Sequence, residues 1–371
     1  MKIFISAILL SISLCIQAYP YRVVAYVAGW NKLKADSIPA EKLTHINYAF
    51  ANVNNGEVVS DPSMPDDSAN LAVLVSLKKR NPDLKILISV GGWTWSKGFS
   101  DAALTDSSRE RFANSALQYM LRYKLDGIDI DWEFPGEPGI GNTFRHEDKE
   151  NFNFFLQSLR KKLDEQSDKE QRIGNNRYLL TIAAGATHKF ISHTQMHIAH
   201  TYLDFINLMT YDFHGEWEKL TGHHSNLYHS ALDGNFRFSI DKSVGLFTQW
   251  NIPSRKIVIG AAFYGRAWTG VENMDNGVCQ YAEKGKEGNF SYKNLKANYI
   301  NKNGYVRYWD KRAKANYLWN AKECTFISYD DKKALRKECR YIKKHKFGGM
   351  MFWEYSNDDQ GELTGLISRK L

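Results

Sequence analysis

The sequence predicts an α/β fold, a (β/α)8 TIM barrel with a small α+β insertion between strands 7 and 8. Eight short runs rich in Val, Ile, Ala and Tyr alternate with longer amphipathic segments, which is the pattern of a parallel sheet with crossover helices. The chain of 371 residues is long enough for one such barrel. The interval between the seventh and eighth runs is unusually long and therefore needs a fold of its own.

Each expected strand is a run of mainly apolar residues bounded by polar or turn residues. The segments 107–123 and 148–165 show the periodicity of helices that bury one face. Eight repeats of a strand followed by a helix favour closure of the sheet into a barrel. The expected strands lie at 23–28, 44–50, 85–90, 125–131, 178–184, 205–209, 256–262 and 347–352.

The long interval before the last run is rich in Asn, Tyr, Lys and Gly and contains short alternating pieces such as 305–309. We expect a small α+β insertion over 271–330 that walls one side of a cleft. The sequence shows no internal repeat and no low-complexity linker. Residues 19–371 are therefore expected to form one barrel domain that carries this insertion.

Residues 1–18 have the composition of a cleaved signal peptide, with a basic residue ahead of the apolar run 3–16. This run is too short to span a bilayer comfortably. We expect a secreted, extracellular protein, or a periplasmic one if the source is bacterial, with no stable membrane anchor. Lipidation of Cys15 is the less favoured alternative, because Leu14 is not the small residue that such processing prefers.

The formal charge of +8 raises the question of a nucleic-acid partner. The basic runs at 78–80 and 343–346 are short, lack interleaved aromatic residues and fall where helices would expose them to solvent. We expect no nucleic-acid partner. After residue 18, the cysteines are Cys279, Cys324 and Cys339, which allow at most one intramolecular disulfide but do not identify the pair.

The most informative segment is 126–133, where Asp129, Asp131 and Glu133 alternate with apolar residues. Strand side chains have a period of two, so the three acids share one face. The opposite face suits the helix layer, and the acids are expected to point into the barrel near its C-terminal mouth, where barrel enzymes work. Adjacent carboxyls repel one another when ionised, so at least one should keep a proton near neutrality and serve as a general acid.

Two alternatives involving metals are less favoured. A Ca²⁺ site would draw its oxygen ligands from several loops rather than from one strand end. His193, His197 and His200 have the spacing of one helix face, but no Glu accompanies them as in a His-Glu-x-x-His site, and they follow the fifth strand rather than the acidic mouth. The sequence also lacks a glycine loop that cradles phosphate. We expect no metal and no cofactor.

The acidic segment resembles the Asp-x-x-Asp-x-Asp-x-Glu signature of glycoside hydrolase family 18, with Asp126, Asp129, Asp131 and Glu133 at its acidic positions. Further motifs of that family occur in the expected order. They are Ser-Val-Gly-Gly-Trp at 89–93, Met-Thr-Tyr-Asp at 209–212, Tyr-Gly-Arg at 264–266, and Trp353. The resemblance covers essentially the whole chain after residue 18, and the long insertion is similar to that of the chitinase branch with an α+β insertion domain. It implies a secreted chitinase.

The resemblance also implies a retaining, substrate-assisted mechanism, because this family is an exception to the usual two-carboxylate scheme. Glu133 would protonate the glycosidic oxygen while the 2-acetamido carbonyl of the substrate attacks the anomeric carbon. Water would then open the oxazolinium intermediate, with Glu133 as base. Asp131 would orient the acetamido N–H and share a proton with Asp129, and Tyr211 would donate a hydrogen bond to the acetamido carbonyl oxygen.

Further positions would bind substrate or support the acids. Trp353 would form the floor beneath the reacting sugar and Trp93 would stack on the next one, with a plain core position as the alternative for each Trp. Chitin and N-acetylglucosamine oligosaccharides are the implied partners, and we expect a monomer. The full set of implied substrate-binding residues is Tyr26, Phe50, Ser89, Gly92, Trp93, Met209, Asp212, Tyr264, Arg266 and Trp353.

Three other functions are weighed against this one. A lectin on the same barrel would have lost the catalytic acid, whereas Glu133, Asp131 and Tyr211 are all present. Enzymes that cleave the chitobiose core of N-glycans usually lack the Asp-Trp-Glu ending and the long insertion. A purely structural barrel would leave the inward acids unexplained.

Overall fold

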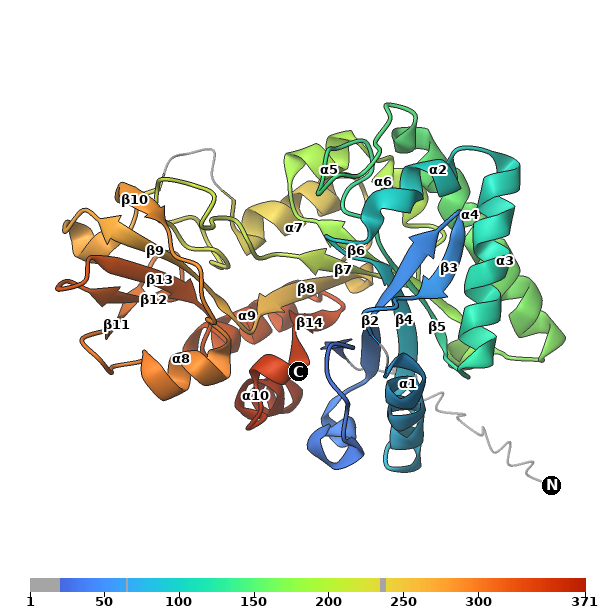
Figure 1. Cartoon of the computed structure of the whole chain (residues 1–371), viewed down its shortest axis with the longest axis horizontal. Helices are drawn as coiled ribbons and strands as arrows, with labels where there is room; N and C mark the ends of the chain where they lie inside the picture. Colours follow the sequence, from blue (N-terminus) through green and yellow to red (C-terminus); the bar gives the residue numbers. More distant parts are fainter. Residues whose placement is uncertain (1–20, 65, 234–237) are drawn as a thin grey trace, which may run out of the picture.

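The computed structural model describes residues 21–64, 66–233 and 238–371, so the expected signal peptide at 1–18 lies outside the described residues. The predicted (β/α)8 barrel is confirmed. Figure 1 shows a second, antiparallel group of strands, β9 to β13, beside the barrel.

The barrel strands occupy the predicted runs with small differences at their ends. The largest difference is in β2, which continues beyond Phe50 because its last residues form a hairpin with β3 (Glu57–Ser60). The barrel strands are β1 (Arg22–Ala28), β2 (His45–Asn54), β4 (Lys85–Gly91), β5 (Gly127–Asp131), β6 (Leu179–Gly185), β7 (Phe205–Met209), β8 (Ile257–Ala262) and β14 (Gly349–Trp353).

The strand order is β1-β14-β8-β7-β6-β5-β4-β2, and pairing of β1 with β2 closes the ring. The neighbours in this ring are parallel. Strands of such a sheet are covered on both faces, which explains why their sequences are nearly continuous apolar runs. The C-terminal ends of all eight strands meet at one mouth.

Helices pack on the outer face of the barrel and bury aromatic side chains there. The predicted helices at 107–123 and 148–165 correspond to α3 and α4, whose Phe112 and Phe155 rings lie 4.6 Å apart in the core. A capping box at Thr105 and Ser108 starts α3. The helices outside the insertion are α1 (Asp67–Ser76), α2 (Phe99–Ala103), α3 (Asp106–Arg122), α4 (Asp148–Lys169), α5 (His188–Ser192), α6 (Met196–Ala199), α7 (Ile240–Gln249), α9 (Lys332–His345) and α10 (Glu362–Lys370).

The insertion lies between β8 and β14, as predicted. It is a five-stranded antiparallel sheet in the order β10-β9-β13-β12-β11, with one helix, and its apolar cluster includes Trp268, Trp319 and Phe326. Its first strand begins at Gly265, before the predicted range 271–330, because the chain leaves β8 and enters the second sheet almost directly. The elements are β9 (Gly265–Val271), β10 (Ala282–Gly285), α8 (Tyr292–Asn298), β11 (Val306–Asp310), β12 (Ala315–Asn320) and β13 (Thr325–Tyr329).

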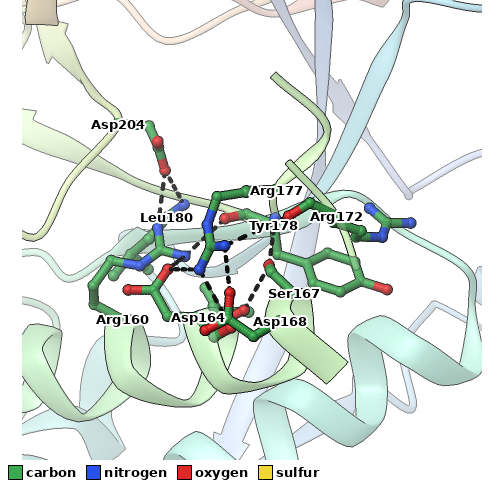
Figure 2. Close-up of polar contacts among 10 residues, drawn as sticks. Arg160, Asp164, Ser167, Asp168, Arg172, Arg177, Tyr178, Leu180 and Asp204 are labelled. Carbon is green, nitrogen blue, oxygen red and sulfur yellow. Dashed lines mark hydrogen bonds and ion pairs between the residues drawn. The ribbon is translucent and has the colours of Figure 1, made fainter. Parts of the chain in front are cut away.

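A polar cluster fastens α4 to the start of β6 (Figure 2). Arg160 of α4 donates to Asp204 Oδ2 at 3.1 Å, and the same oxygen accepts the backbone N–H of Leu180 at 2.7 Å. Arg177 donates to Asp164 of α4 at 3.0 Å. These contacts fix the position of β6, which contributes Thr181 to the barrel interior.

The remaining expectations concern surface features. The run 343–346 ends α9 and is exposed, as predicted. The three histidines considered as a metal face do not share one helix, because α5 ends at Ser192 before α6 begins. Cys339 is buried on α9, whereas Cys279 and Cys324 contact the apolar cluster of the insertion. In the three described ranges, no helix is long and apolar enough to cross a membrane.

Candidate active site

The acidic strand end has the predicted alternation. Asp129 and Asp131 on β5 are buried, while Ile130 and Trp132 belong to the apolar layer between the sheet and the helices. Trp132 stacks on Phe99 of α2 with ring centroids 5.4 Å apart. The apolar residues thus anchor one face of the strand beneath the helices, and the acids face the interior of the barrel.

Asp129 lies deepest and is held by donors from four other strands. Tyr26 Oη and Ser89 Oγ each donate to Oδ2 at 2.8 Å. Thr181 Oγ1 and Asn207 Nδ2 donate to Oδ1 at 2.5 and 3.3 Å. Burial raises the pKa of Asp129, and the hydrogen bonds oppose that rise. The result is a buried carboxyl that is fixed in place and binds a proton more readily than an exposed aspartate does.

Asp131 and Glu133 both favour the protonated form. Burial raises the pKa of Asp131 well above its usual range, and the nearby carboxyls Glu133 and Asp129 raise it further. Its Oδ1 has no hydrogen-bond partner among the described residues. Burial, followed by the negative charge of Asp212, raises the pKa of Glu133 from 4.5 to about 8. Glu133 therefore carries a proton at neutral pH, as a general acid requires.

Asp212 is the opposite case. Burial acts to raise its pKa, but its polar neighbours His224 and Arg266 hold the pKa well below the usual range. Arg266 donates to both carboxylate oxygens at 2.8 Å, and Tyr264 Oη donates to Oδ1 at 2.8 Å. A permanently ionised carboxylate therefore lies near a protonated one, an arrangement that separates acid and anion roles.

Aromatic rings form the floor and rim of the mouth. Trp353, at the end of β14, stacks on Phe50 with ring centroids 5.5 Å apart, and Trp30 packs edge-on against it at 6.0 Å. Gly92 has φ +82°, and a Cβ there would lie 2.7 Å from the Phe50 ring, so the position requires glycine. Trp93 is 48% exposed, which excludes the alternative of a plain core residue. Exposed ring faces of this kind suit the flat faces of sugars.

Tyr211 follows β7 and lies near both the acids and Trp353. Tyr211, Met209 and Trp353 pack against one apolar cluster that includes Tyr26 and Phe50. Burial raises the pKa of Tyr211 well above its usual range, and the neighbouring acids raise it further. Its hydroxyl is therefore a hydrogen-bond donor throughout the physiological pH range. This cluster and the polar contacts of the acids bring most of the predicted site residues together, whereas the exposed ring of Trp93 lies outside the cluster.

Sequence reasoning missed several polar residues that hold the acids. Thr181 and Asn207 bond to Asp129, and each is a polar residue within an apolar strand, which is the signal that could have revealed them. Ser96 Oγ accepts the backbone N–H of Glu133, and Asn142 Nδ2 donates to the carbonyl of Glu133, both at 2.9 Å. Ser96 begins a short 3-10 helix and Asn142 lies in a loop, and in neither segment does a periodic pattern mark the residue.

The side chains of the candidate active site described above carry mainly carboxyl groups, hydroxyl groups and aromatic rings. Within the described ranges, no group of three or more His, Cys, Asp or Glu residues is arranged to hold a metal ion.

Known proteins resemble this chain in sequence and fold. The family described as "Glycosyl hydrolases family 18" matches residues 22–358. Chitinase A1 of Niallia circulans is 37% identical to this chain, over 95% of the chain and 58% of the relative. Chitinase B of Serratia marcescens is 31% identical, over 89% of the chain and 76% of the relative. The chain thus spans less than two thirds of the first relative and about three quarters of the second.

A solved structure agrees with these matches. The family 18 N-acetylglucosaminidase from Paenibacillus barengoltzii superposes with a TM-score of 0.87 at 42% identity, covering 95% of this chain and 100% of that one. The fold, the acidic strand end and the comparisons lead to one assignment: the chain belongs to glycosyl hydrolase family 18 and is a glycoside hydrolase of the chitinase type.

Proposed function

We propose that this enzyme hydrolyses β-1,4 linkages between N-acetylglucosamine units of chitin and chitooligosaccharides, with retention at the anomeric carbon and Glu133 as general acid and base. The observation that carries the proposal is the environment of Glu133. It is a partly buried carboxyl at the barrel mouth with a pKa raised to about 8, so it holds the proton that the leaving oxygen needs.

The state of the other carboxyls supports attack by the substrate itself. A carboxylate nucleophile must be ionised and have a free oxygen. Asp212 is ionised, but Arg266 and Tyr264 engage its oxygens. The pKa of Asp131 lies well above its usual range because of burial, so it is a poor nucleophile. The 2-acetamido carbonyl of the bound sugar is left to attack the anomeric carbon.

The first step forms an oxazolinium ion. The acetamido oxygen bonds to the anomeric carbon as the bond to the leaving oxygen breaks, and Glu133 transfers its proton to that oxygen. Asp131 Oδ1, which is buried and has no partner among the described residues, accepts the acetamido N–H. Tyr211 donates its hydroxyl to the acetamido carbonyl oxygen.

The second step returns the enzyme to its starting state. Ionised Glu133 takes a proton from water, and the hydroxide formed adds to the anomeric carbon from the face that the leaving group vacated, while the bond between that carbon and the acetamido oxygen breaks and restores the acetamido group. Two inversions give net retention. Asp129 shares the proton of Asp131 during this cycle, and its four donors stabilise the charge that it acquires.

Substrate range and location complete the proposal. Trp353 and the exposed rings of Trp30 and Trp93 offer stacking surfaces for consecutive sugars and support binding of chitin chains. The expected signal peptide at 1–18 supports secretion. We propose that the secreted form acts as a monomer.

A second candidate activity is release of single N-acetylglucosamine units from chain ends. The N-acetylglucosaminidase with 42% identity and complete coverage favours it. Both activities use the same acid, so they differ only in the products formed from a long oligosaccharide.

Hydrolysis of a chitohexaose tests the proposal. The purified protein is compared with Glu133→Gln, and products are followed by chromatography together with their anomeric form. We expect β-anomers first, and a decrease in kcat of roughly 10²–10⁴-fold in the variant, the usual contribution of a general acid. Disaccharide products indicate chitinase action, and monosaccharide alone indicates the second candidate.

Glu165→Gln is the matched control, because Glu165 is an exposed carboxyl on the outer helix α4. It should keep full activity. Initial α-anomers would overturn retention, and a Glu133→Gln variant with wild-type kcat would overturn the role of Glu133.

A further inference from the structure

His224 is a buried imidazole beside the active site that the mechanism above does not use. It lies in the long segment between β7 and α7, and its side chain is 0% exposed. Its ring packs edge-on against Tyr264, with centroids 5.3 Å apart. Its Nδ1 lies 3.6 Å from Asp212 Oδ1, just beyond hydrogen-bond distance.

The backbone of His224 is fixed on both sides. Its N–H donates to Ser328 Oγ of β13 at 2.9 Å, which ties it to the insertion. Its carbonyl accepts the N–H of Phe213 at 3.1 Å, and Phe213 directly follows Asp212 in the chain. The imidazole is therefore held at a set distance from the carboxylate by two contacts that do not involve its side chain.

The ring nitrogens of His224 have no hydrogen-bond partner among the described residues. A buried polar atom without a partner is unfavourable, and a residue needed only for packing would be apolar. Among the described residues, the carboxylate that Nδ1 approaches is that of Asp212. A small rotation of the ring that moves Nδ1 toward Asp212 by a few tenths of an ångström would convert this contact into a hydrogen bond. Hydrogen bonds in active sites often shorten only when substrate is bound.

We propose that His224 is a positioning residue for hydrolysis, which donates through Nδ1 to Asp212 and keeps that carboxylate oriented toward the reacting sugar. The inference rests on the proposed function, and it takes Asp212 as a substrate-binding residue, as the family resemblance implies. Tyr264 and Arg266 also donate to Asp212, but both are partly exposed. In the proposed function a bound sugar would offer hydroxyls that compete for these two donors. His224 approaches from the buried side and has no such competitor.

Burial keeps the imidazole of His224 neutral. Burial lowers the pKa of His224, the charge of Asp212 opposes this, and Arg266 and His223 lower the pKa further. Tyr264, which packs on the ring, stays protonated because burial raises its pKa. His224 thus acts as a neutral donor near pH 7 and not as a second cation beside Asp212.

Two substitutions separate the donor from the shape of the ring. His224→Phe keeps a buried ring without a donor, whereas His224→Asn keeps a donor of similar reach. We expect His224→Phe to lower kcat/KM about tenfold, the equivalent of one charge-assisted hydrogen bond, and to move the acidic limb of the pH profile to higher pH. The shift follows because Asp212 without this donor binds a proton more readily. His224→Asn should restore most of kcat/KM and the position of the limb.

The control is His45→Phe, since His45 begins β2 at the opposite end of the barrel and packs on Phe205. It should leave the pH profile unchanged. Wild-type kinetics in folded His224→Phe, or equal losses in the Phe and Asn variants, would overturn the proposal. If the Phe variant does not fold, a folded Asn variant with a loss above about tenfold overturns it. Failure of the proposed function gives a different result. In that case the Glu133→Gln variant keeps wild-type kcat, whichever residue stands at position 224.

Discussion

The charge of Asp212 is predicted to set how far into alkaline pH this enzyme retains its general acid. Asp212→Asn replaces the carboxylate by an amide of the same shape, whose oxygen can still accept a hydrogen bond from Arg266 or Tyr264. Glu133 acts as an acid only while it is protonated, so the activity falls as the pH rises through the pKa of Glu133.

The magnitude follows from the causes of the raised pKa. Burial is the larger cause of the rise from 4.5 to about 8, and the charge of Asp212 is the second. Burial is unchanged in the variant, so only the smaller contribution is lost. We expect the pKa of Glu133 to fall by about 1, equivalent to roughly 1.4 kcal/mol, and the alkaline limb of kcat/KM to move to lower pH by the same amount.

The assay is kcat/KM for a soluble chitooligosaccharide between about pH 5 and 10, a range that spans the altered pKa values. Asp83→Asn serves as the control, because Asp83 is an exposed carboxyl that precedes β4 at the far end of the barrel. The reasoning is refuted if the alkaline limb of Asp212→Asn coincides with that of the wild type or moves to higher pH.

Two further predictions concern stability. Gly92→Ala places a Cβ 2.7 Å from the Phe50 ring at φ +82°, and should lower the free energy of unfolding in urea by about 1–3 kcal/mol; an unchanged midpoint would contradict it. His214 lies 2.7 Å from Glu218 and 3.0 Å from Asp233; burial acts to lower its pKa, but these acids raise it overall. Its stabilisation is therefore present below the unfolded pKa near 6.5 and lost as the pH rises through the raised value. Thermal melting over about pH 6–9 should show a larger decrease for the wild type than for His214→Asn, and parallel curves would count against this role.

The faces of β5 could be predicted from sequence because the information is local. Asp129, Asp131 and Glu133 alternate with Ile130 and Trp132, and a period of two leaves only one assignment once the apolar side is buried under helices. The positions of the other strands could also be predicted from local sequence, because buried parallel strands are apolar on both faces. Continuous runs of this type cannot show where a hairpin extends a strand, as in β2.

The partners of the acids could not be predicted in the same way. Thr181 and Asn207 meet at Asp129 only because the ring closes, and the pairing of distant strands is not encoded in any one run. His224 is harder still, because it belongs to a long irregular segment and is placed by contacts with Ser328 of the insertion. The second sheet begins at Gly265, before the predicted insertion range 271–330, because the motif that carries Arg266 belongs to both the site and the second sheet.

The place of β14 in the barrel has a consequence for biosynthesis. β14 pairs with both β1 and β8, yet it is made after the whole insertion. While the ribosome is still translating the insertion, β1 and β8 each present an open edge to the crowded cell. The antiparallel sheet of the insertion can assemble from nearby segments during that interval, whereas the ring must wait for residues near 350. A translational stall or premature stop ahead of β14 would leave β1 and β8 with unpaired strand edges on an otherwise folded chain. Chaperones and proteases act on such products.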